Sequence, residues 1–583
     1  MRDDATVDRI LLAFGREMRP WGRSLLATYF TVDPRSLGLF RVLFGLVLLS
    51  DLVRRWVELG VWYTNSGLLP NHTLLWRPPT KNLFSLFFTA SNQPEAQLGF
   101  VLCAAVYTLF ILGYRTRWIQ VLALLARVSL NSRLAVLENG GDMVMDLLAL
   151  LTLPLPLGAR FSLDALALRP ASRTPAAEAN EANEANEANE ANEANEANEA
   201  GARRKVSDAT TAPVVSLAVF ALLLQFAAIY LFNASSKTGL AWRDGSAVHY
   251  ALHQDKLVTS LGVWMREHLS VSTLRALTWS TLATEWLGFA LLITPFFVKQ
   301  ARLLAVCIMP ALHLGFALGL NVGGFSPAMI SFYPLLLGAE HWSWLSRRWG
   351  TRLRPIRAEL ERRVRPWLRL RPVASASASA GRTSRWLGEG AMLVILVAIA
   401  SEALNDNAAV PQALRFQQPR WAKAIIEYPR ILQGWRMFAS EPSRVDSMIY
   451  VDALTAGDER VDPYNAVASN QREPAGFIVP THMGQSQFFV MYSERIPYDG
   501  YAAYRTAFSE WLLAYAERTG RARDCLLSYE VYLVTDRSPE PGSEAQPTPL
   551  ERRLFMSYVA PPDSPCRLER AKKVARASGV SAG

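Results

Sequence analysis

The sequence has few charged residues for its length and only four cysteines. Asp, Glu, Lys and Arg make up 19% of its 583 residues, whereas half of the residues are hydrophobic and 17 are Trp. This composition excludes an ordinary soluble enzyme of this size. The chain also lacks a P-loop, a G-x-S-x-G elbow, an H-E-x-x-H helix and a C-x-x-C pair, so the sequence predicts no metal site. We therefore consider an integral membrane protein first.

The opening stretch MRDDATVDRILLAFGREMRPWGR lacks the features of a removable signal peptide. It contains neither an uninterrupted apolar segment nor a cleavage site of small residues. We expect residues 1–35 to remain in the protein as a cytoplasmic amphipathic segment.

Long apolar runs are abundant. Crossing a hydrocarbon core of about 30 Å takes roughly 20 helical residues, and nine runs approach that length. The sequence thus predicts an all-α polytopic membrane protein with about nine transmembrane helices and a small C-terminal α+β extramembrane domain. The runs lie at 36–56, 98–114, 118–137, 142–158, 213–233, 273–297, 301–320, 323–342 and 387–405.

The positions of Lys and Arg predict the orientation, because positive loops stay on the cytoplasmic side. With nine spans and a cytoplasmic N-terminus, all four basic clusters face inward and the C-terminal domain is periplasmic. The protein is then a multi-pass protein of a bacterial inner membrane. Its net charge of +10 reflects mostly this positive-inside pattern, with attraction of residues 343–371 to anionic lipid of the bilayer, and does not indicate nucleic acid. The clusters are GYRTRW at 113–118, GARRK at 201–205, VKQAR at 298–302 and the Arg-rich stretch 347–371.

Two low-complexity segments interrupt the predicted transmembrane domain, residues 36–405. The linker 166–212 contains a perfect three-residue repeat, EANEAN, from Glu178 to Ala200, which has no apolar face and cannot bury a core. The basic cytoplasmic loop 343–386 contains VASASASAGRTS, a flexible tether before the last span.

Residues 406–583 have the composition of a soluble α+β domain. Four segments rich in β-branched and aromatic residues predict strands at 447–455, 487–494, 525–535 and 552–560. Residues 501–520 have apolar positions at helical spacing and end at a Gly, as an amphipathic helix does. Because this domain is predicted to be periplasmic, Cys525 and Cys566 are expected to form a disulfide.

Ionisable residues at membrane depth are candidate functional groups, because each costs about 2.5 to 3.5 kcal/mol unless it faces a partner or a cavity. Arg41 and Asp142 could equally snorkel or cap a helix, and His313 could be a satisfied core histidine. Glu285 lies in the middle of a span and needs a proton or a partner. Lys237, just past the fifth run, is by itself most simply a snorkelling anchor.

A neighbouring pair of histidines, His249 and His253, lies four residues apart in the sequence. This spacing is compatible with a metal site, but the sequence offers no third ligand. A wet interfacial helix is the simpler interpretation of the pair.

The stretch YLFNASSKTGLAWRDGSAVHY, residues 230–250, resembles the active-site segment of vitamin K-dependent gamma-carboxylases. In both, an apolar span ends before a Lys that precedes a Trp by five residues, with a Gly after it. HLGFALGLNVGGFS at 313–326 and GWRMFAS at 434–440, followed by AGDERVDP, are similar to further carboxylase segments. The chain is identified as a member of the wider bacterial HTTM-domain family by LGLFRVLFGLVLLSD, GYRTRW, NGGDMVMDLL and LPLGARFSLD.

This resemblance implies a quinone-type pocket in which Lys237 acts as the base toward a reduced naphthoquinone. Trp242 would fix the loop at the membrane interface, and Asp244 with Gly245 would turn the chain and cap the next helix. The chain departs from the carboxylases in the third outside-facing turn region. The carboxylases have a histidine there, whereas this chain has Asn139, Gly140, Gly141 and Asp142. It also has Ser236 where they have the first of two lysines.

The sequence leaves two functions open. One is an epoxidase-like or carboxylase-like enzyme that uses a reduced quinone and oxygen, with Lys237 as base. The other is a non-enzymatic membrane protein that binds lipid or quinone, or presents its C-terminal domain to a partner. Two departures favour it: the one at Asn139, and the shortening of the long lumenal region with which the carboxylases bind propeptide-bearing substrates. A transporter is weaker, because the sequence has no evident inverted repeat or broken helix pair.

Overall fold

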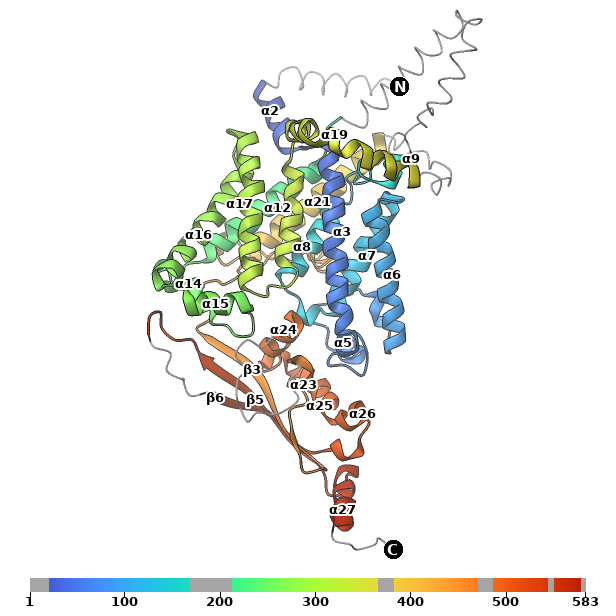
Figure 1. Cartoon of the computed structure of the whole chain (residues 1–583), viewed down its shortest axis with the longest axis vertical. Coiled ribbons are helices and arrows are strands. Elements are labelled where there is room, and N and C mark those ends of the chain that lie inside the picture. Colours follow the sequence, from blue (N-terminus) through green and yellow to red (C-terminus); the bar gives the residue numbers. More distant parts are fainter. Residues whose placement is uncertain (1–19, 168–211, 365–381, 470–485, 544–549, 578–583) are drawn as a thin grey trace, which may run out of the picture.

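The computed structural model describes residues 20–167, 212–364, 382–469, 486–543 and 550–577. Within these residues, six helices are long and apolar enough to cross a membrane (Figure 1). Two of them are the most buried, with 61% of the α3 window and 67% of the α12 window inside the protein against 22–28% for the others. The bundle is therefore built around α3 and α12. The six are α3 (Pro34–Val57), α6 (Gln93–Leu112), α12 (Leu217–Ser236), α16 (Val271–Ile293), α17 (Val298–Gly319) and residues 386–406 of α21 (Arg382–Asp406).

The three remaining predicted spans form shorter helices packed among these six. α7 (Thr116–Arg133) lies beside α6 and ends in polar residues, and α8 (Gly140–Leu151) has 12 residues, about 18 Å of helix. The eighth run forms α18 (Phe325–Phe332) and a 3-10 turn (Tyr333–Leu336), and both pack against α3. Six membrane-length helices are thus present, while nine crossings stay a prediction.

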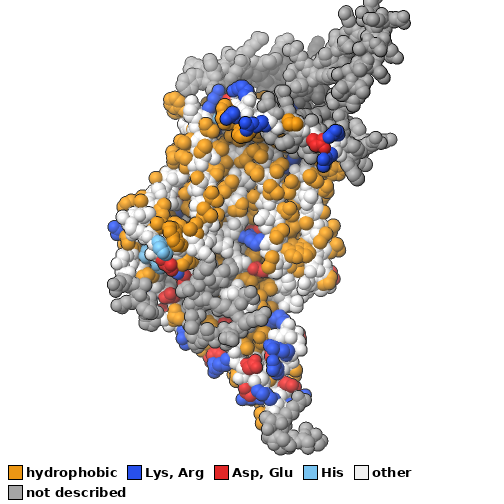
Figure 2. Space-filling model, viewed as in Figure 1, with side chains coloured by type: hydrophobic (Ala, Val, Ile, Leu, Met, Phe, Trp, Pro, Cys, Tyr) orange, Lys and Arg blue, Asp and Glu red, His pale blue; other side chains and the backbone are white. Residues whose placement is uncertain are grey.

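Opposite ends of the bundle carry different elements (Figure 1). One end holds α2 (Pro20–Tyr29), α9 (Leu163–Ala167) and α19 (Ala339–Val364), and a short sheet pairs β1 (Thr31–Val32) with β2 (Val214–Val215). The C-terminal domain lies at the other end. Hydrophobic side chains cover the bundle between these ends, and charged side chains gather at the ends (Figure 2). The side of the membrane on which each end lies stays a prediction.

Two predicted linkers fall largely outside the described residues. The EAN repeat from Glu178 to Ala200 and the tether at 373–384 are both affected, except for the last residues of the tether, where α21 begins. The first half of the predicted basic loop is helical, because α19 continues to Val364.

The C-terminal domain contains a four-stranded antiparallel sheet in the order β4-β3-β5-β6. Alternate residues of the central strands, such as Ile449 and Val451 on β3 and Val531 on β5, are fully buried, as a sheet with one covered face requires. The α+β prediction is confirmed for this part of the chain. The strands are β3 (Val445–Thr455), β4 (Arg460–Val461), β5 (Leu526–Arg537) and β6 (Glu551–Val559).

The strand predicted at 487–494 is wrong, because these residues form α24 (Gln487–Arg495). The buried side chains Phe488, Phe489 and Tyr492 share one helix face and pack around Trp62 of the bundle, with ring centroids 4.9 to 6.5 Å apart. Tertiary packing of this face outweighs the strand preference of the aromatic residues.

The helix predicted at 501–520 is broken into shorter pieces. A 3-10 turn (Asp499–Tyr504) leads into α25 (Arg505–Leu513) and α26 (Tyr515–Thr519), with an interruption at Ala514. Gly520 ends the last piece at φ +68°, a conformation that favours glycine. The structure also joins Cys525 to Cys566 in a disulfide, with Cα atoms 5.2 Å apart.

Candidate functional site

Lys237 follows directly on the last residue of α12. The polar residues before it end this helix, because the hydroxyls of Ser235 and Ser236 donate to the carbonyl of Phe232 at 3.3 and 2.6 Å. Such side-chain bonds to a carbonyl one turn back compete with the backbone hydrogen bonds of the helix. Asn233 Oδ1 accepts from the backbone N–H of Met437 at 2.9 Å, so the end of the span is tied to the segment after the last membrane helix.

Lys237 forms a buried ion pair with Glu285 of α16. Its Nζ lies 2.5 Å from both carboxylate oxygens, and the two residues are 7% and 5% exposed. The partner that a mid-span carboxylate requires is therefore the lysine at the end of α12. An isolated ammonium–carboxylate pair in a low-dielectric setting holds one proton that either group can carry.

Trp242 also contacts the lysine. Its ring centroid lies 4.9 Å from Lys237 Nζ, a cation–π distance. The residue is only 5% exposed, and its Nε1–H donates to the carbonyl of Phe438 at 3.0 Å. Trp242 is thus buried against the lysine and is not an exposed anchor at the membrane interface, because the chain from 437 onward covers it.

Residues 437–441 pack over the polar turn that follows α12, residues 237–241; we call this covering segment the roof. The N–H of Gly239 donates to the carbonyl of Ser440 at 3.0 Å, and the N–H of Ala241 donates to the carboxylate of Glu441 at 2.9 Å. A Cβ on Gly239 would lie 2.8 Å from Glu441 side-chain atoms, so this close approach requires glycine. The polar residues that follow the fifth predicted span therefore form the surface against which residues 437–441 pack.

Asp244 does not cap the next helix as predicted. The N-cap position of α14 (Ala247–Leu252) is Ser246, and Asp244 Oδ1 accepts from the N–H and the hydroxyl of Ser246 at 2.8 and 2.6 Å. Asp244 therefore closes an Asx turn two residues earlier. Gly245 adopts a φ of +85° in this turn. The turn therefore lies at the predicted position, although Asp244 does not cap the helix after it.

His313 belongs to a buried chain of hydroxyl and imidazole groups. Tyr230 lies two helical turns before Lys237 on the same face of α12, and its hydroxyl bonds to His313 Nε2 at 2.7 Å and to the Tyr333 hydroxyl. His313 Nδ1 has no hydrogen-bond partner within the described residues. Gly288, one turn after Glu285, admits Met309 of α17, because a Cβ there would lie 2.5 Å from Met309 Cε.

Asn139 and Asp142 lie at the N-terminus of α8. They form a capping box, in which Asn139 Oδ1 accepts from the N–H groups of Gly141 and Asp142 at 2.9 and 3.3 Å. Asp142 is 1% exposed, and its Oδ1 also binds Arg55 at 2.5 Å and Arg127 at 2.7 Å. The residue therefore caps the helix, one of its two expected roles, and pairs with two cations as well.

These arginines belong to a fully buried set of charged groups, which we call the arginine–aspartate network. Asp51 Oδ2 lies 2.7 Å from Arg55 and 3.1 Å from Arg127. Arg127 Nε lies 3.0 Å from Asp146. The five members are Asp51, Arg55, Arg127, Asp142 and Asp146, and each is at most 5% exposed.

Sequence reasoning missed four of the five network members. Asp51 and Arg55 are four residues apart near the end of the first predicted span, a spacing that favours an ion pair on one helix face. Arg127 and Asp146 also lay within predicted spans. The signal was available in the rule that an ionisable residue at membrane depth needs a partner.

Residues from separate segments that resemble the carboxylases or the HTTM-domain family lie together near the roof. A Cβ on Gly140 would lie 3.3 Å from Met437 Sδ and 3.6 Å from a ring carbon of Phe325. The same Phe325 ring lies 5.5 Å from the His313 ring. Met437 in turn binds Asn233 through its N–H. The three short motifs after Asn139, around His313 and around Met437 are thus neighbours of the α12 end in space.

Arg41 lies elsewhere, near the opposite end of the bundle. It is fully buried and donates to the backbone carbonyls of Leu157 and Phe161. A Cβ on Gly113 would collide with its guanidinium. Arg41 therefore fixes the loops at that end and does not contact Lys237.

The two neighbouring histidines are held by backbone carbonyls. His249 Nε2 bonds to Pro539 O, and His253 Nδ1 bonds to His249 O, both at 2.8 Å. Burial lowers the pKa of His253 to about 4, so its ring is neutral at physiological pH. In the described residues no group of three His, Cys, Asp or Glu could hold a metal ion.

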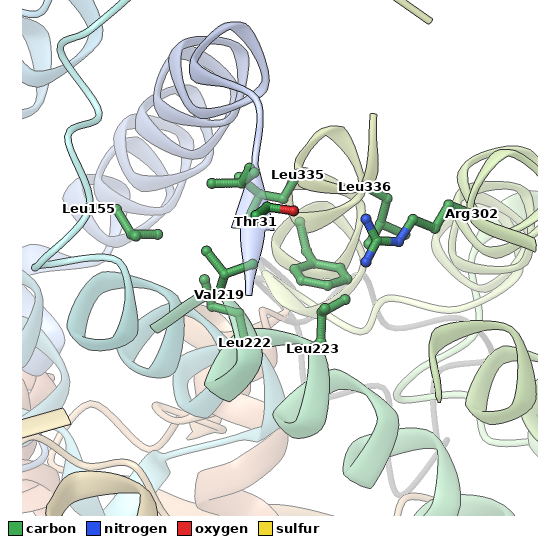
Figure 3. Close-up of a pocket in the computed structure, with 10 residues that line it drawn as sticks. Thr31, Leu155, Val219, Leu222, Leu223, Arg302, Leu335 and Leu336 are labelled. Atoms are coloured by element: carbon green, nitrogen blue, oxygen red, sulfur yellow. The ribbon is translucent and has the colours of Figure 1, made fainter. Parts of the chain in front are cut away.

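A pocket is present at the opposite end of the bundle from Lys237 (Figure 3). Apolar side chains from α12, the β1 strand and the turn after α18 surround it, and Arg302 of α17 is its charged member. Arg302 donates to the carbonyl of Thr28 in α2. Its apolar members include Val219, Leu222, Leu223, Phe332, Leu335 and Leu336.

Comparisons with protein-family models, with curated proteins and with solved structures found no match for this chain. The family assignment therefore stays a prediction from the short motifs.

Proposed function

We propose that the Lys237–Glu285 pair is the proton-accepting centre of a membrane enzyme that acts on a reduced quinone with oxygen. The observation that carries the proposal is the isolated pair itself, with Nζ 2.5 Å from both carboxylate oxygens and both residues nearly excluded from solvent. The resemblance of residues 230–250 to the carboxylases supplies the substrate class.

The pair, rather than the lysine alone, acts as the base. When the proton lies on Glu285, Lys237 is a neutral amine that can accept the proton of a quinol hydroxyl. When the proton lies on Lys237, Glu285 is the acceptor instead. In both cases the centre ends with two protons and a quinolate, which becomes the electron donor to oxygen. Trp242 limits the position of the ammonium group through its ring.

We assign proton exchange with the centre to the His313–Tyr230–Tyr333 chain, in which the Tyr230 hydroxyl bonds to both other groups. Tyr230 lies on the Lys237 face of α12, and its ring is near Gly288, one turn from Glu285. A hydroxyl that bonds to an imidazole can pass a proton along the bond. We therefore assign Tyr230 and His313 to positioning and proton exchange, with no direct contact to the substrate.

The test is oxygen-dependent turnover of a reduced naphthoquinone by the full chain in lipid vesicles. Lys237→Arg keeps the charge but cannot give up a proton near neutral pH, because the pKa of arginine stays above about 12. We expect Lys237→Arg, Lys237→Ala and Glu285→Gln to accumulate normally and to lose turnover of the quinol and formation of its epoxide.

Lys256 offers a matched control. It is a second buried lysine, 7% exposed, and it pairs with Asp446 at 3.3 Å and Glu494 at 2.9 Å. Lys256→Arg should keep full turnover. If Lys237→Arg is as active as Lys256→Arg, Lys237 is an anchor. If the wild-type chain binds quinone but never turns it over, the non-enzymatic function is the correct one.

A further inference from the structure

One face of the second half of α7 carries hydrogen-bond donors that have no acceptor within the described residues. Ser129, Ser132 and Arg133 are spaced i, i+3 and i+4, so they lie together on the helix. All three are at most 1% exposed. The hydroxyls of both serines, and Nε and Nη1 of Arg133, have no hydrogen-bond partner within the described ranges of the chain.

This face is distinct from the one that carries the network. Arg127, on the other side of α7, pairs with three carboxylates. Arg133 instead donates one hydrogen bond, from Nη2 to the carbonyl of Leu69 at 2.8 Å, and lies 6.0 Å from the ring centroid of Tyr63. In the part of the chain that the structure describes, no carboxylate forms an ion pair with it.

A fully buried guanidinium without a counter-charge is strongly unfavourable, as are buried hydroxyls without partners. The arrangement has one uncompensated positive charge and several donors without partners on one helix face. Hydrogen bonds from a charged donor to an anion are about twice as strong as neutral ones. The chemistry that satisfies this set is therefore a small group with one negative charge and only acceptor sites.

We propose that Ser129, Ser132 and Arg133 form a binding site for a small monovalent anion at the end of α7. Nearby contacts hold the helix in place without using these donors: Ser85 Oγ donates to the carbonyl of Ser129 at 2.6 Å, and the Tyr63 hydroxyl donates to the carbonyl of Leu130 at 3.0 Å. Complete burial excludes bulky anions. The site is independent of the quinol function.

The test is thermal unfolding of the full chain in detergent, with chloride, formate or nitrate replacing gluconate at constant ionic strength. Binding to the folded state raises the midpoint in a saturable way, by about 1 °C at tenfold excess over the dissociation constant and by more at higher excess. Equilibrium dialysis with radiolabelled chloride or formate should then give one anion per chain. The choice among the three anions identifies whether a spherical or a planar ion fits.

Arg133→Gln should abolish both the saturable shift and the bound label. Arg117→Gln is the control, because Arg117 lies on the same helix but is exposed. If Arg133→Gln does not accumulate, the double variant Ser129→Ala and Ser132→Ala decides, because it keeps the charge and should weaken binding about tenfold or more. The proposal is overturned if no anion shifts the wild-type midpoint, or if the shift survives in these variants.

Discussion

Two of the buried charge clusters in the bundle differ in the number of their partners. In the arginine–aspartate network each arginine contacts at least two carboxylates, and Asp51 and Asp142 each contact at least two arginines. The Lys237–Glu285 pair has a single partner on each side. Moving a proton in the network would leave several charges unbalanced, whereas moving the proton within the pair leaves two neutral groups. The number of partners therefore distinguishes the network from the pair to which we assign the proposed chemistry.

Their positions in the fold support the same division. The network joins α3, α7 and α8, and it continues toward the C-terminal region, since Asn131 bridges Asp146 and Glu138, and Glu138 forms a two-point ion pair with Arg430 at 3.1 and 2.5 Å. The Lys237–Glu285 pair joins only α12 and α16. The network thus connects many elements, and the pair lies at a single helix contact.

Breaking the network should have the largest effect. Arg127→Gln removes the cation that contacts three carboxylates and leaves buried negative charge without compensation, which costs about 3 to 5 kcal/mol. We expect strongly reduced accumulation in the membrane and a lower thermal midpoint in detergent.

Arg117→Gln on the same helix is the matched control and should stay within about 0.5 kcal/mol of the wild type, because Arg117 is exposed. Wild-type accumulation and melting of Arg127→Gln would show that the network carries little stability.

Sequence patterns were sufficient for six of the nine predicted membrane helices, because hydrophobicity over 20 residues depends little on tertiary contacts. They failed for residues 487–494, where the same aromatic residues suit a strand or a helix and only the contact with Trp62 decides. The partner of Glu285 lies 48 residues away in the chain, and no local spacing could identify Lys237 as that partner. The network is equally non-local, since Asp142 meets Arg55 across 87 residues.

A third kind of buried charge lies in the C-terminal domain and sharpens the comparison. Asp462 is 7% exposed, and its carboxylate accepts from amide N–H groups of Val451, Tyr464 and Asn465 at 2.9 to 3.2 Å. Burial raises the pKa of Asp462 to about 6 from its ordinary value of 3.8, against these hydrogen bonds. The amide hydrogen bonds therefore offset the burial of this carboxyl only in part.

This pKa predicts a pH dependence of stability. The folded state binds the proton of Asp462 more tightly than the unfolded state, so the contribution is most favourable below pH 4, decreases as the pH rises toward 6 and is constant above it. The decrease is about 3 kcal/mol. Asp462→Asn lacks this titration, so the difference in unfolding free energy between the wild type and this variant should fall by about 2 kcal/mol from pH 4 to pH 7, because the unfolded carboxyl is already more than half ionised at pH 4.

Urea titrations of the full chain, followed by fluorescence, measure this difference at each pH. Asp452→Asn on the neighbouring strand is the control, because Asp452 forms an ion pair with Arg460 at the surface of the domain. A difference that stays constant from pH 4 to pH 7 in Asp462→Asn would mean that the amide hydrogen bonds fully offset the burial of this carboxyl.

The smallest effect on stability is expected at the Lys237–Glu285 pair, the site of the proposed chemistry. Replacing both members of the pair by apolar residues of similar size, Lys237→Met with Glu285→Leu, removes two desolvated charges together and should leave the unfolding free energy within about 1 kcal/mol of the wild type. Lys237→Met alone should cost about 1 to 3 kcal/mol, because Glu285 loses its partner but can bind a proton in place of it. The thermal midpoints of the two single variants and the double variant form a cycle that gives their coupling. A double variant as unstable as Arg127→Gln would show that the pair, like the network, is a structural element. Every candidate base for quinol turnover in the bundle would then also be required for stability.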